Sequence, residues 1–287
     1  MKIARFLKEG KLCVGLVDVE ENRIYPFDPA LSDVTDLIRA TVWGSALQKP
    51  RTAPVALDEV RLVAPIVPER NVFCVGKNYR AHAKEFSQSG FEAGATKGKE
   101  IDEYPAIFSK PPSSIIGPGD TVELHPEATS AVDYEAELAL IIGKPGRNIA
   151  PADAMDHIWG YTIVNDVTAR DRQRNHKQWF AGKGLDTFCP MGPWIVTVDE
   201  LDAKDIDIEC RVNGELRQQA NTRDLIFDIP QLLASISAGL TLQPGDVIAT
   251  GTPAGVGIGF EPPRFLKAGD RVDVTVSGIG TLSNPFA

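Results

Sequence analysis

The sequence predicts a β-rich α+β protein, and three observations support this fold class. Short apolar runs that end at glycine or proline recur along the chain, which is typical of many short strands. The 25 Gly and 21 Pro are scattered as turn signals rather than gathered in a linker. A Gly-Asp turn leads into an expected strand three times, at 117–122, 244–248 and 268–272. These copies are unevenly spaced, so they indicate a β-rich body and not a repeat array.

Length, charge and cysteine content limit the class of protein. A chain of 287 residues is long enough for one large or two unequal domains. The net charge of −9 argues against a nucleic-acid partner, because such proteins usually carry a basic surface. No apolar stretch approaches the roughly 18 residues of a membrane span, and the charged start does not fit a signal peptide. The four cysteines lie far apart, which predicts reduced thiols, no zinc site and a cytoplasmic location.

Residues 1–58 are expected to form a small N-terminal domain, and residues 59–287 the main domain. The elements expected in the first part are strands at 2–6, 12–17 and 23–27, a short helix at 33–47 and a connector at 48–60. Glu9 and Gly10 suit the turn of a hairpin between the first two strands. Nothing in this part suggests chemistry, so we expect a cap or a module that supports a dimer.

The second part contains mostly short strands. We expect strands at 60–66, 71–76, 106–110, 133–143, 159–164, 206–212 and 215–222, and helical segments at 77–86, 151–157 and 229–239. Within 189–198 we expect a Pro-Met-Gly-Pro turn that leads into a further strand. Asn213-Gly214 is a strong hairpin signal, and Gly239 suits the end of a helix.

The run from Asp133 to Gly143 is expected to form one strand with two acidic side chains on one face. Side chains alternate along a strand, so Glu135 and Glu137 share a face while the opposite face is apolar. Two buried carboxylates this close repel each other and lose hydration unless a cation lies between them. Oxygen ligands favour Mg²⁺, Mn²⁺ or Ca²⁺ over zinc. The alternative is an edge strand whose glutamates face water.

His82 and Glu85 are three residues apart, so on a helix they lie on one face. A carboxylate beside a histidine orients the ring and increases its basicity, which is a general-base arrangement. The alternative is a solvated salt bridge. Residues 87–104 are polar and Gly-rich, and they are interpreted either as a mobile lid over a site or as a surface insertion.

Further polar residues follow the expected strands. Asp166 comes where a strand ends, and Arg170 and Gln173 would share a helix face behind it. Lys183 lies between two glycines, so it could approach a bound anion, although a solvated loop lysine is equally compatible. The stretch 250–257 lacks the Lys-Ser/Thr of a P-loop. Its backbone N–H groups and hydroxyls could bind a carboxylate, or it could be a plain tight turn.

Taken in order, these motifs resemble the fumarylacetoacetate hydrolase family, in the acylpyruvase-like bacterial branch that carries a small extra N-terminal domain. The resemblance covers about residues 60–287. It rests on Gly76-x-Asn78-Tyr79-x-x-His82-x-x-Glu85, Asp133-Tyr134-Glu135-x-Glu137, Asn165-Asp166-Val167-Thr168-Ala169-Arg170-Asp171, Lys183 and Gly251-Thr252-Pro253-x-Gly255-Val256-Gly257. It implies a mixed β-sandwich roll, a homodimer, and one Mg²⁺ or Mn²⁺ per subunit.

The resemblance also implies roles for individual residues. The implied metal ligands are Glu135, Glu137 and Asp166, and the implied catalytic residues are His82, Glu85 and Lys183. The implied substrate-binding residues are Arg170, Gln173, Gly251 and Thr252. A fourth metal carboxylate, present in the mammalian namesake enzyme, has no counterpart that we identify here.

The resemblance implies a metal-dependent hydrolase that cleaves the C–C bond of an acylpyruvate or another 2,4-dioxo acid through a pyruvate enolate. The same enolate could serve a decarboxylase of the oxaloacetate type, or an isomerase or hydratase acting on a 2-oxo-dienoate. The expected partner is a small 2-oxo acid, with no nucleic acid and no membrane. A non-enzymatic paralogue is disfavoured, because it would be free to lose the carboxylates, the His–Glu pair and the lysine.

Overall fold

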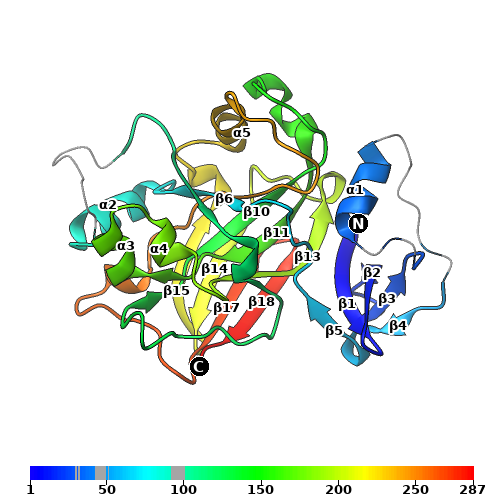
Figure 1. The fold of residues 1–287 in the computed structure, drawn as a ribbon, viewed down its shortest axis with the longest axis horizontal. Coiled ribbons are helices and arrows are strands. Elements are labelled where there is room, and N and C mark those ends of the chain that lie inside the picture. Colours follow the sequence, from blue (N-terminus) through cyan, green and yellow to red (C-terminus); the bar gives the residue numbers. More distant parts are fainter. Residues whose placement is uncertain (30, 32, 43–49, 51, 92–100) are drawn as a thin grey trace.

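The protein is described by a computed structural model that covers residues 1–287 except 30, 32, 43–49, 51 and 92–100. Its main feature is a 12-stranded mixed sheet that begins in the N-terminal unit and continues into the rest of the chain (Figure 1). In sheet order the strands are β4 (Val55–Ala56), β3 (Arg23–Pro26), β2 (Lys11–Asp18), β1 (Lys2–Lys8), β13 (Cys189–Thr197), β11 (Ile158–Asn165), β10 (Ala136–Ile142), β16 (Val247–Ala249), β6 (Val72–Gly76) and β7 (Ala106–Lys110), with β5 (Arg61–Val63) on β1 and β8 (Ile115–Ile116) on β13.

A second, antiparallel sheet packs against the first. Its strands in order are β15 (Glu215–Asn221), β14 (Asp207–Val212), β17 (Arg271–Val276) and β18 (Gly280–Pro285). Leu138 of β10 and Cys210 of β14 belong to the same buried apolar core, so the two sheets form a mixed β-sandwich. A short pair, β9 (Val132–Asp133) and β12 (Thr168–Ala169), lies beside them.

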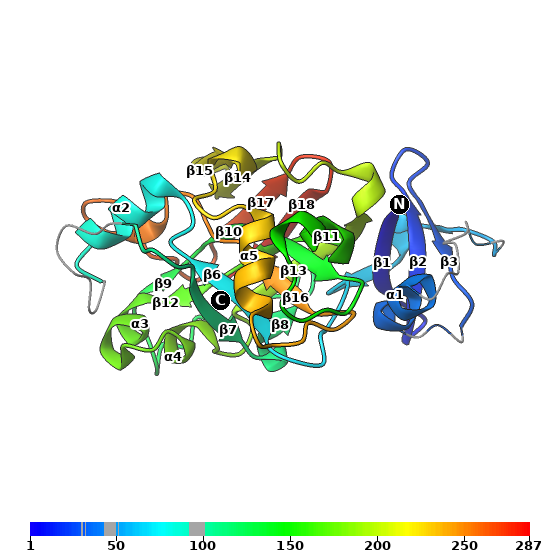
Figure 2. The same cartoon turned by 90° about the horizontal axis from the view of Figure 1, so that it is seen from above.

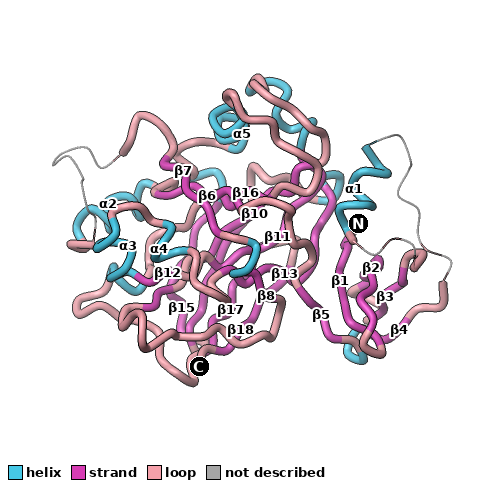
Figure 3. The backbone as a smooth tube through the Cα atoms, in the orientation of Figure 1, coloured by secondary structure: helices cyan, strands magenta, loops and turns pink. Residues whose placement is uncertain are grey.

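The helices lie outside the strands (Figure 3). They are α1 (Val34–Val42), α2 (Arg80–Gln88), α3 (Arg170–His176), α4 (Phe180–Lys183) and α5 (Ile229–Ser237), with 3-10 turns at Leu57–Glu59, Pro112–Ser114, Pro151–His157, Val198–Glu200, Thr222–Asp224 and Gly257–Gly259. Asp228 and Gln231 form a capping box that starts α5. The N-terminal unit lies at one end of the long axis and α2 lies at the other (Figure 2).

The predicted acidic strand is central, which excludes the alternative of an edge strand. β10 pairs with β11 on one side and β16 on the other, and every residue of β10 is buried. The prediction of one unbroken strand from Asp133 to Gly143 was wrong, because Tyr134 and Glu135 lie outside the strands and separate β9 from β10. There the Asn165 side chain accepts the Glu135 N–H at 3.0 Å in place of a regular ladder bond.

The three Gly-Asp turns have different outcomes. Two of them lead into β16 and β17 as predicted. The turn at 117–122 does not, because Val122 forms only an isolated bridge with Phe286. The helix expected at 33–47 is present as α1, and residues 43–47 lie outside the described part. The connector expected at 48–60 contains β4, which pairs with β3.

Among the described residues, no helix is both long and apolar enough to cross a membrane.

Candidate active site

Three buried carboxylates meet where β10 begins and β11 ends. Glu135 directly precedes β10, Glu137 lies within β10, and Asp166 directly follows β11, the neighbouring strand. One oxygen from each lies within 4.8 Å of the other two, and all three residues are buried. Antiparallel pairing of β10 and β11 brings the start of one strand beside the end of the other, which explains why residues thirty positions apart in the sequence converge here.

Two buried lysines bind this carboxylate cluster. The Lys183 ammonium, at the end of α4, lies 2.7 Å from Glu135 Oε2 and 2.6 Å from Asp166 Oδ2. Lys110, at the end of β7, donates to Asp166 Oδ1 at 2.6 Å and to the carbonyls of Val167 and Lys183. Sequence reasoning found Lys183 and missed Lys110. The only sequence signal for Lys110 was a single charge at the end of an otherwise apolar strand.

The cluster contains two glutamates with opposite electrostatic environments. Burial raises the pKa of Glu135, but the charges of Lys183 and Arg170 outweigh burial and lower its pKa to about 2. Burial also raises the pKa of Glu137, and the neighbouring carboxylates of Asp166 and Glu135 raise it further, well above the ordinary range. Glu137 has no ion pair among the described residues. Its Oε2 accepts a hydrogen bond from the Gly251 N–H at 2.8 Å.

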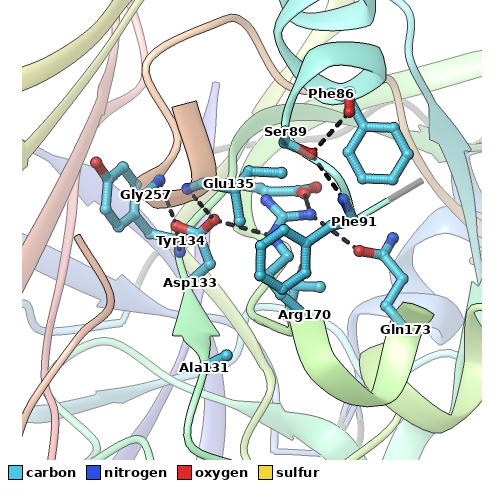
Figure 4. A network of polar contacts seen from close by, with 12 residues as sticks. Phe86, Ser89, Phe91, Ala131, Asp133, Tyr134, Glu135, Arg170, Gln173 and Gly257 are labelled. Atoms are coloured by element: carbon cyan, nitrogen blue, oxygen red, sulfur yellow. Dashed lines mark hydrogen bonds and ion pairs between the residues drawn. The ribbon is translucent and has the colours of Figure 1, made fainter. Parts of the chain in front are cut away.

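Arg170, the first residue of α3, connects the carboxylate cluster to a buried aspartate (Figure 4). Its Nη1 lies 2.7 Å from Glu135 Oε1 and 3.2 Å from Gln173 Oε1, and its Nε donates to Asp133 Oδ2 at 2.9 Å. The Nη2 atom of Arg170 is buried without a partner among the described residues. Sequence reasoning missed the role of Asp133, although this residue opens the same acidic motif.

His82 and Glu85 form the predicted pair on α2. The His82 Nδ1 lies 3.0 Å from Glu85 Oε2, and Glu85 Oε1 accepts the Gly255 N–H at 2.9 Å. A side chain at Gly259 would collide with Glu85, because a Cβ there would lie 1.8 Å from Oε1. His82 is 3% exposed, so the alternative of a solvated surface pair is excluded.

The Gly-rich loop after β16 donates its backbone N–H groups to the protein's own carboxylates. Gly251 donates to Glu137 and Gly255 donates to Glu85. Gly257 and Ile258 donate to the two oxygens of Asp133, at 2.6 and 3.2 Å. The alternative of a plain tight turn is therefore excluded. The substrate-binding role of Gly251 stays a prediction, with its N–H engaged by Glu137 in this structure.

Six of the ten predicted site residues line one small pocket, and Glu85, Glu137, Asp166 and Gly251 are not among its lining residues. It is lined by side chains from both parts of the site, namely His82, Glu135, Arg170, Gln173, Lys183 and Thr252, and by the aromatic residues Phe86, Phe108 and Trp179. Its free volume is about 10 Å³, which is room for about one water molecule. A substrate of several carbon atoms would therefore need these side chains to move. Residues 92–100 of the predicted lid lie outside the described residues.

The donor set fits a divalent cation. Four buried carboxylates, those of Asp133, Glu135, Glu137 and Asp166, face three buried cationic side chains, those of Lys110, Arg170 and Lys183. Among the described residues this leaves one negative charge without a partner. The three oxygens that converge are hard ligands of the kind that Mg²⁺ and Mn²⁺ prefer.

The fold and this site define a β-sandwich enzyme with a buried carboxylate site suited to a divalent metal ion. The chain belongs to the fumarylacetoacetate hydrolase family: residues 71–287 match the family model described as fumarylacetoacetate (FAA) hydrolase C-terminal. Residues 1–65 match a second model, described as Rv2993c-like, N-terminal. The family and the fold class predicted from the sequence are thereby confirmed. The proposed domain boundary at residues 58 and 59 stays a prediction.

Relatives with different activities in their names share this architecture. Oxaloacetate tautomerase YisK of Bacillus subtilis is 53% identical over 231 residues, which is 80% of this chain and 74% of that protein. A fumarylacetoacetate hydrolase from Exiguobacterium antarcticum is 45% identical with a TM-score of 0.86, over 100% of this chain and 99% of that one. A 5-carboxymethyl-2-hydroxymuconate delta-isomerase from Mycobacterium smegmatis is 37% identical with a TM-score of 0.79, over 100% and 99%.

Proposed function

We propose that the protein is a metal-dependent tautomerase that interconverts the enol and keto forms of a small 2-oxo acid of the oxaloacetate type. The observation that carries this proposal is the position of His82, oriented by Glu85, in the same small pocket as Glu135 and Lys183 of the carboxylate cluster. Tautomerisation moves one proton between a carbon and an oxygen, so it needs no attacking water and no exit for a leaving group. The names of the tautomerase and isomerase relatives support the same reaction class.

A divalent cation held by Glu135, Glu137 and Asp166 would stabilise negative charge on the oxygens of the 2-oxo acid. The Glu85 carboxylate can only accept a hydrogen bond, so His82 carries its hydrogen on Nδ1 and keeps Nε2 free as a base. We propose that His82 moves the proton at the substrate carbon. Lys183 would donate a hydrogen bond to the oxygen that becomes negatively charged.

The test measures the loss of enol absorbance after enol-oxaloacetate is added to the protein with Mg²⁺ or Mn²⁺. We expect metal-dependent acceleration that chelator abolishes. His82→Ala should lower the enzymatic rate by roughly 10²–10⁴-fold, the usual loss for a general base, while Mg²⁺ affinity stays unchanged. Tautomerisation at the uncatalysed rate with metal present would contradict the proposal.

A second candidate is hydrolysis of an acylpyruvate. The 45%-identical structure named a fumarylacetoacetate hydrolase favours it, as does a His–Glu pair beside a space that holds about one water molecule. In that reaction His82 would deprotonate water for attack on the distal carbonyl, and Lys183 would stabilise the oxyanion.

The two candidates are separated by a substrate panel of enol-oxaloacetate, acylpyruvates and fumarylpyruvate under identical metal conditions. Release of pyruvate from an acylpyruvate without acceleration of enol loss would establish the hydrolase and refute the tautomerase. Decarboxylation of oxaloacetate is followed in the same samples as CO₂ release. We expect decarboxylation to survive His82→Ala better than hydrolysis, because CO₂ leaves without attack by water.

A further inference from the structure

Two threonines follow β16 at alternate positions, and their hydroxyl groups are used differently. The Thr250 hydroxyl donates to the Leu138 carbonyl at 2.8 Å, so its hydrogen is engaged within the sheet. The Thr252 hydroxyl instead accepts a hydrogen bond, from Gln218 Nε2 at 2.8 Å. No acceptor for the Thr252 hydroxyl hydrogen is found in the described part of the chain. Thr252 lines the pocket beside His82 and Lys183, and it is 2% exposed.

Gln218 comes from β15, in the second sheet, and is completely buried. Its surroundings fix which end of its amide is the donor. The Ala136 N–H, which can only donate, lies 3.0 Å from Oε1, and the Pro253 carbonyl, which can only accept, lies 2.7 Å from Nε2. The two hydrogens of Nε2 are therefore directed to the Pro253 carbonyl and to Thr252 Oγ1.

A hydroxyl group carries one hydrogen and two acceptor positions. Because Gln218 fills an acceptor position of Thr252 and needs both of its own hydrogens, the Thr252 hydrogen cannot point back at Gln218. The Thr252 hydroxyl hydrogen can instead point into the pocket that Thr252 lines.

We propose that Gln218 is a positioning residue that holds the Thr252 hydroxyl as a hydrogen-bond donor toward an acceptor oxygen of the bound 2-oxo acid, a carboxylate or an enolate oxygen. The inference rests on the proposed function only in taking this pocket as the substrate site. Sequence reasoning did not find Gln218, because it lies in a hairpin 34 residues before Thr252.

The test titrates oxalate, as a mimic of the enolate of a 2-oxo acid, into Mg²⁺-loaded protein by calorimetry. Thr252→Val should weaken oxalate binding roughly 10- to 100-fold, the range for loss of a hydrogen bond to a charged group. Thr252→Ser, which keeps the hydroxyl, should bind oxalate within about threefold of the wild type. Thr250→Val is the matched control, and it should leave oxalate affinity unchanged because that hydroxyl is directed away from the pocket.

The decisive variant is Gln218→Glu, assayed at alkaline pH so that the new carboxylate is ionised. It keeps the shape and the acceptor for the Ala136 N–H, but it turns the donor into an acceptor that draws the Thr252 hydrogen away from the pocket. The loss of oxalate affinity caused by Gln218→Glu should be at least about fivefold larger with Thr252 present than in a Thr252→Val background. Any direct repulsion between the new charge and oxalate is the same in both backgrounds and cancels.

An equal loss in both backgrounds would overturn the proposal, as would a fall in Mg²⁺ affinity that accounts for the oxalate effect. Either result would assign Gln218 a purely structural role at the start of β10. If Gln218→Glu does not fold, Gln218→Met replaces it. We then expect a smaller loss of oxalate affinity, which should again occur with Thr252 present and not in the Thr252→Val background. Oxalate binding does not require turnover, so the outcome is independent of the tautomerase assay.

Discussion

The carboxylate cluster has a Glu135 side and a Glu137 side, and the charged groups around these two glutamates differ. Glu135 and Glu137 are two residues apart and both are buried, yet Glu135 lies against Lys183 and Arg170. Within the described part of the chain, Glu137 accepts a hydrogen bond from the Gly251 N–H and forms no ion pair. Lys183 and Arg170 stabilise the ionised form of Glu135 without any metal. For Glu137, burial and the charges of Asp166 and Glu135 outweigh the charge of Lys183 and the Gly251 N–H, so a bound cation would change the Glu137 side most. Repulsion from Asp166 and Glu135 therefore contributes to the raised pKa of Glu137.

The largest expected effect is on metal binding, and it should be shared by both sides. Glu135→Gln and Glu137→Gln each remove one charged ligand from the proposed cation site. We expect each to weaken Mg²⁺ binding by more than about 100-fold, the upper end of losses seen when only a supporting residue is changed. Calorimetric titration with Mg²⁺ measures this. Metal affinity within tenfold of wild type in either variant would mean that the cluster does not hold the ion.

The stability of the metal-free protein should separate the two sides. Glu135→Gln breaks a buried pair with Lys183 and should lower the free energy of unfolding by about 3–5 kcal/mol. Glu137→Gln should instead raise it, because it removes a carboxylate whose pKa is raised by burial and by the neighbouring charges of Asp166 and Glu135. Urea unfolding in chelator measures both. Destabilisation of similar size in the two variants would refute the comparison.

The pH dependence of stability should differ between the two sides in sign. The pKa of Glu135 is lowered, so its contribution is present above its ordinary pKa and is lost as the pH falls toward about 2. The pKa of Glu137 is raised, so its contribution is present below its ordinary pKa and is lost as the pH rises through the raised value. Metal-free protein should therefore lose stability as the pH rises from the ordinary pKa of a glutamate toward the raised pKa of Glu137. Unfolding curves at several pH values should show a larger loss in the wild type than in Glu137→Gln, in which the raised pKa of the buried Asp133 still contributes.

A smaller effect is expected from Asp133→Asn, which acts on the Glu135 side from a distance. Asp133 fixes Arg170 and accepts the N–H groups of Gly257 and Ile258, but it is not part of the carboxylate triad. We expect KM for the 2-oxo acid to rise about tenfold through displaced Arg170, with Mg²⁺ affinity unchanged. Steady-state kinetics with a parallel Mg²⁺ titration measures both. An unchanged KM would show that Arg170 is held without Asp133.

Much of the fold could be predicted from local signals, because turns and apolar runs act over a few residues. The Asn213-Gly214 hairpin is of this kind. The break at Tyr134 and Glu135 could not be predicted, since it depends on Asn165 from another strand. The isolated bridge at Val122 likewise depends on Phe286, at the other end of the chain.

The site shows the same division. Glu135, Glu137, Asp166, His82 and Lys183 were found because their motifs combine acidic, basic and glycine residues in a recognisable order. Lys110 and Gln218 were missed, because neither belongs to a recognisable motif and each acquires its role only through contacts with distant segments. The structure also shows that the loop amides bind Glu85, Glu137 and Asp133. The sequence could suggest anion binding there, but it could not identify the anions.

The pairing of β1 with β13 fixes the N-terminal unit to the main sheet. The N-terminal unit continues the main sheet through backbone hydrogen bonds between Lys2–Ile3 and Ile195–Val196, so it cannot swing as a tethered module would. Removing it would uncover the edge of β13, whose other neighbour, β11, ends directly before Asp166. A deletion at the N-terminus would therefore expose an aggregation-prone strand edge one strand away from the carboxylate cluster.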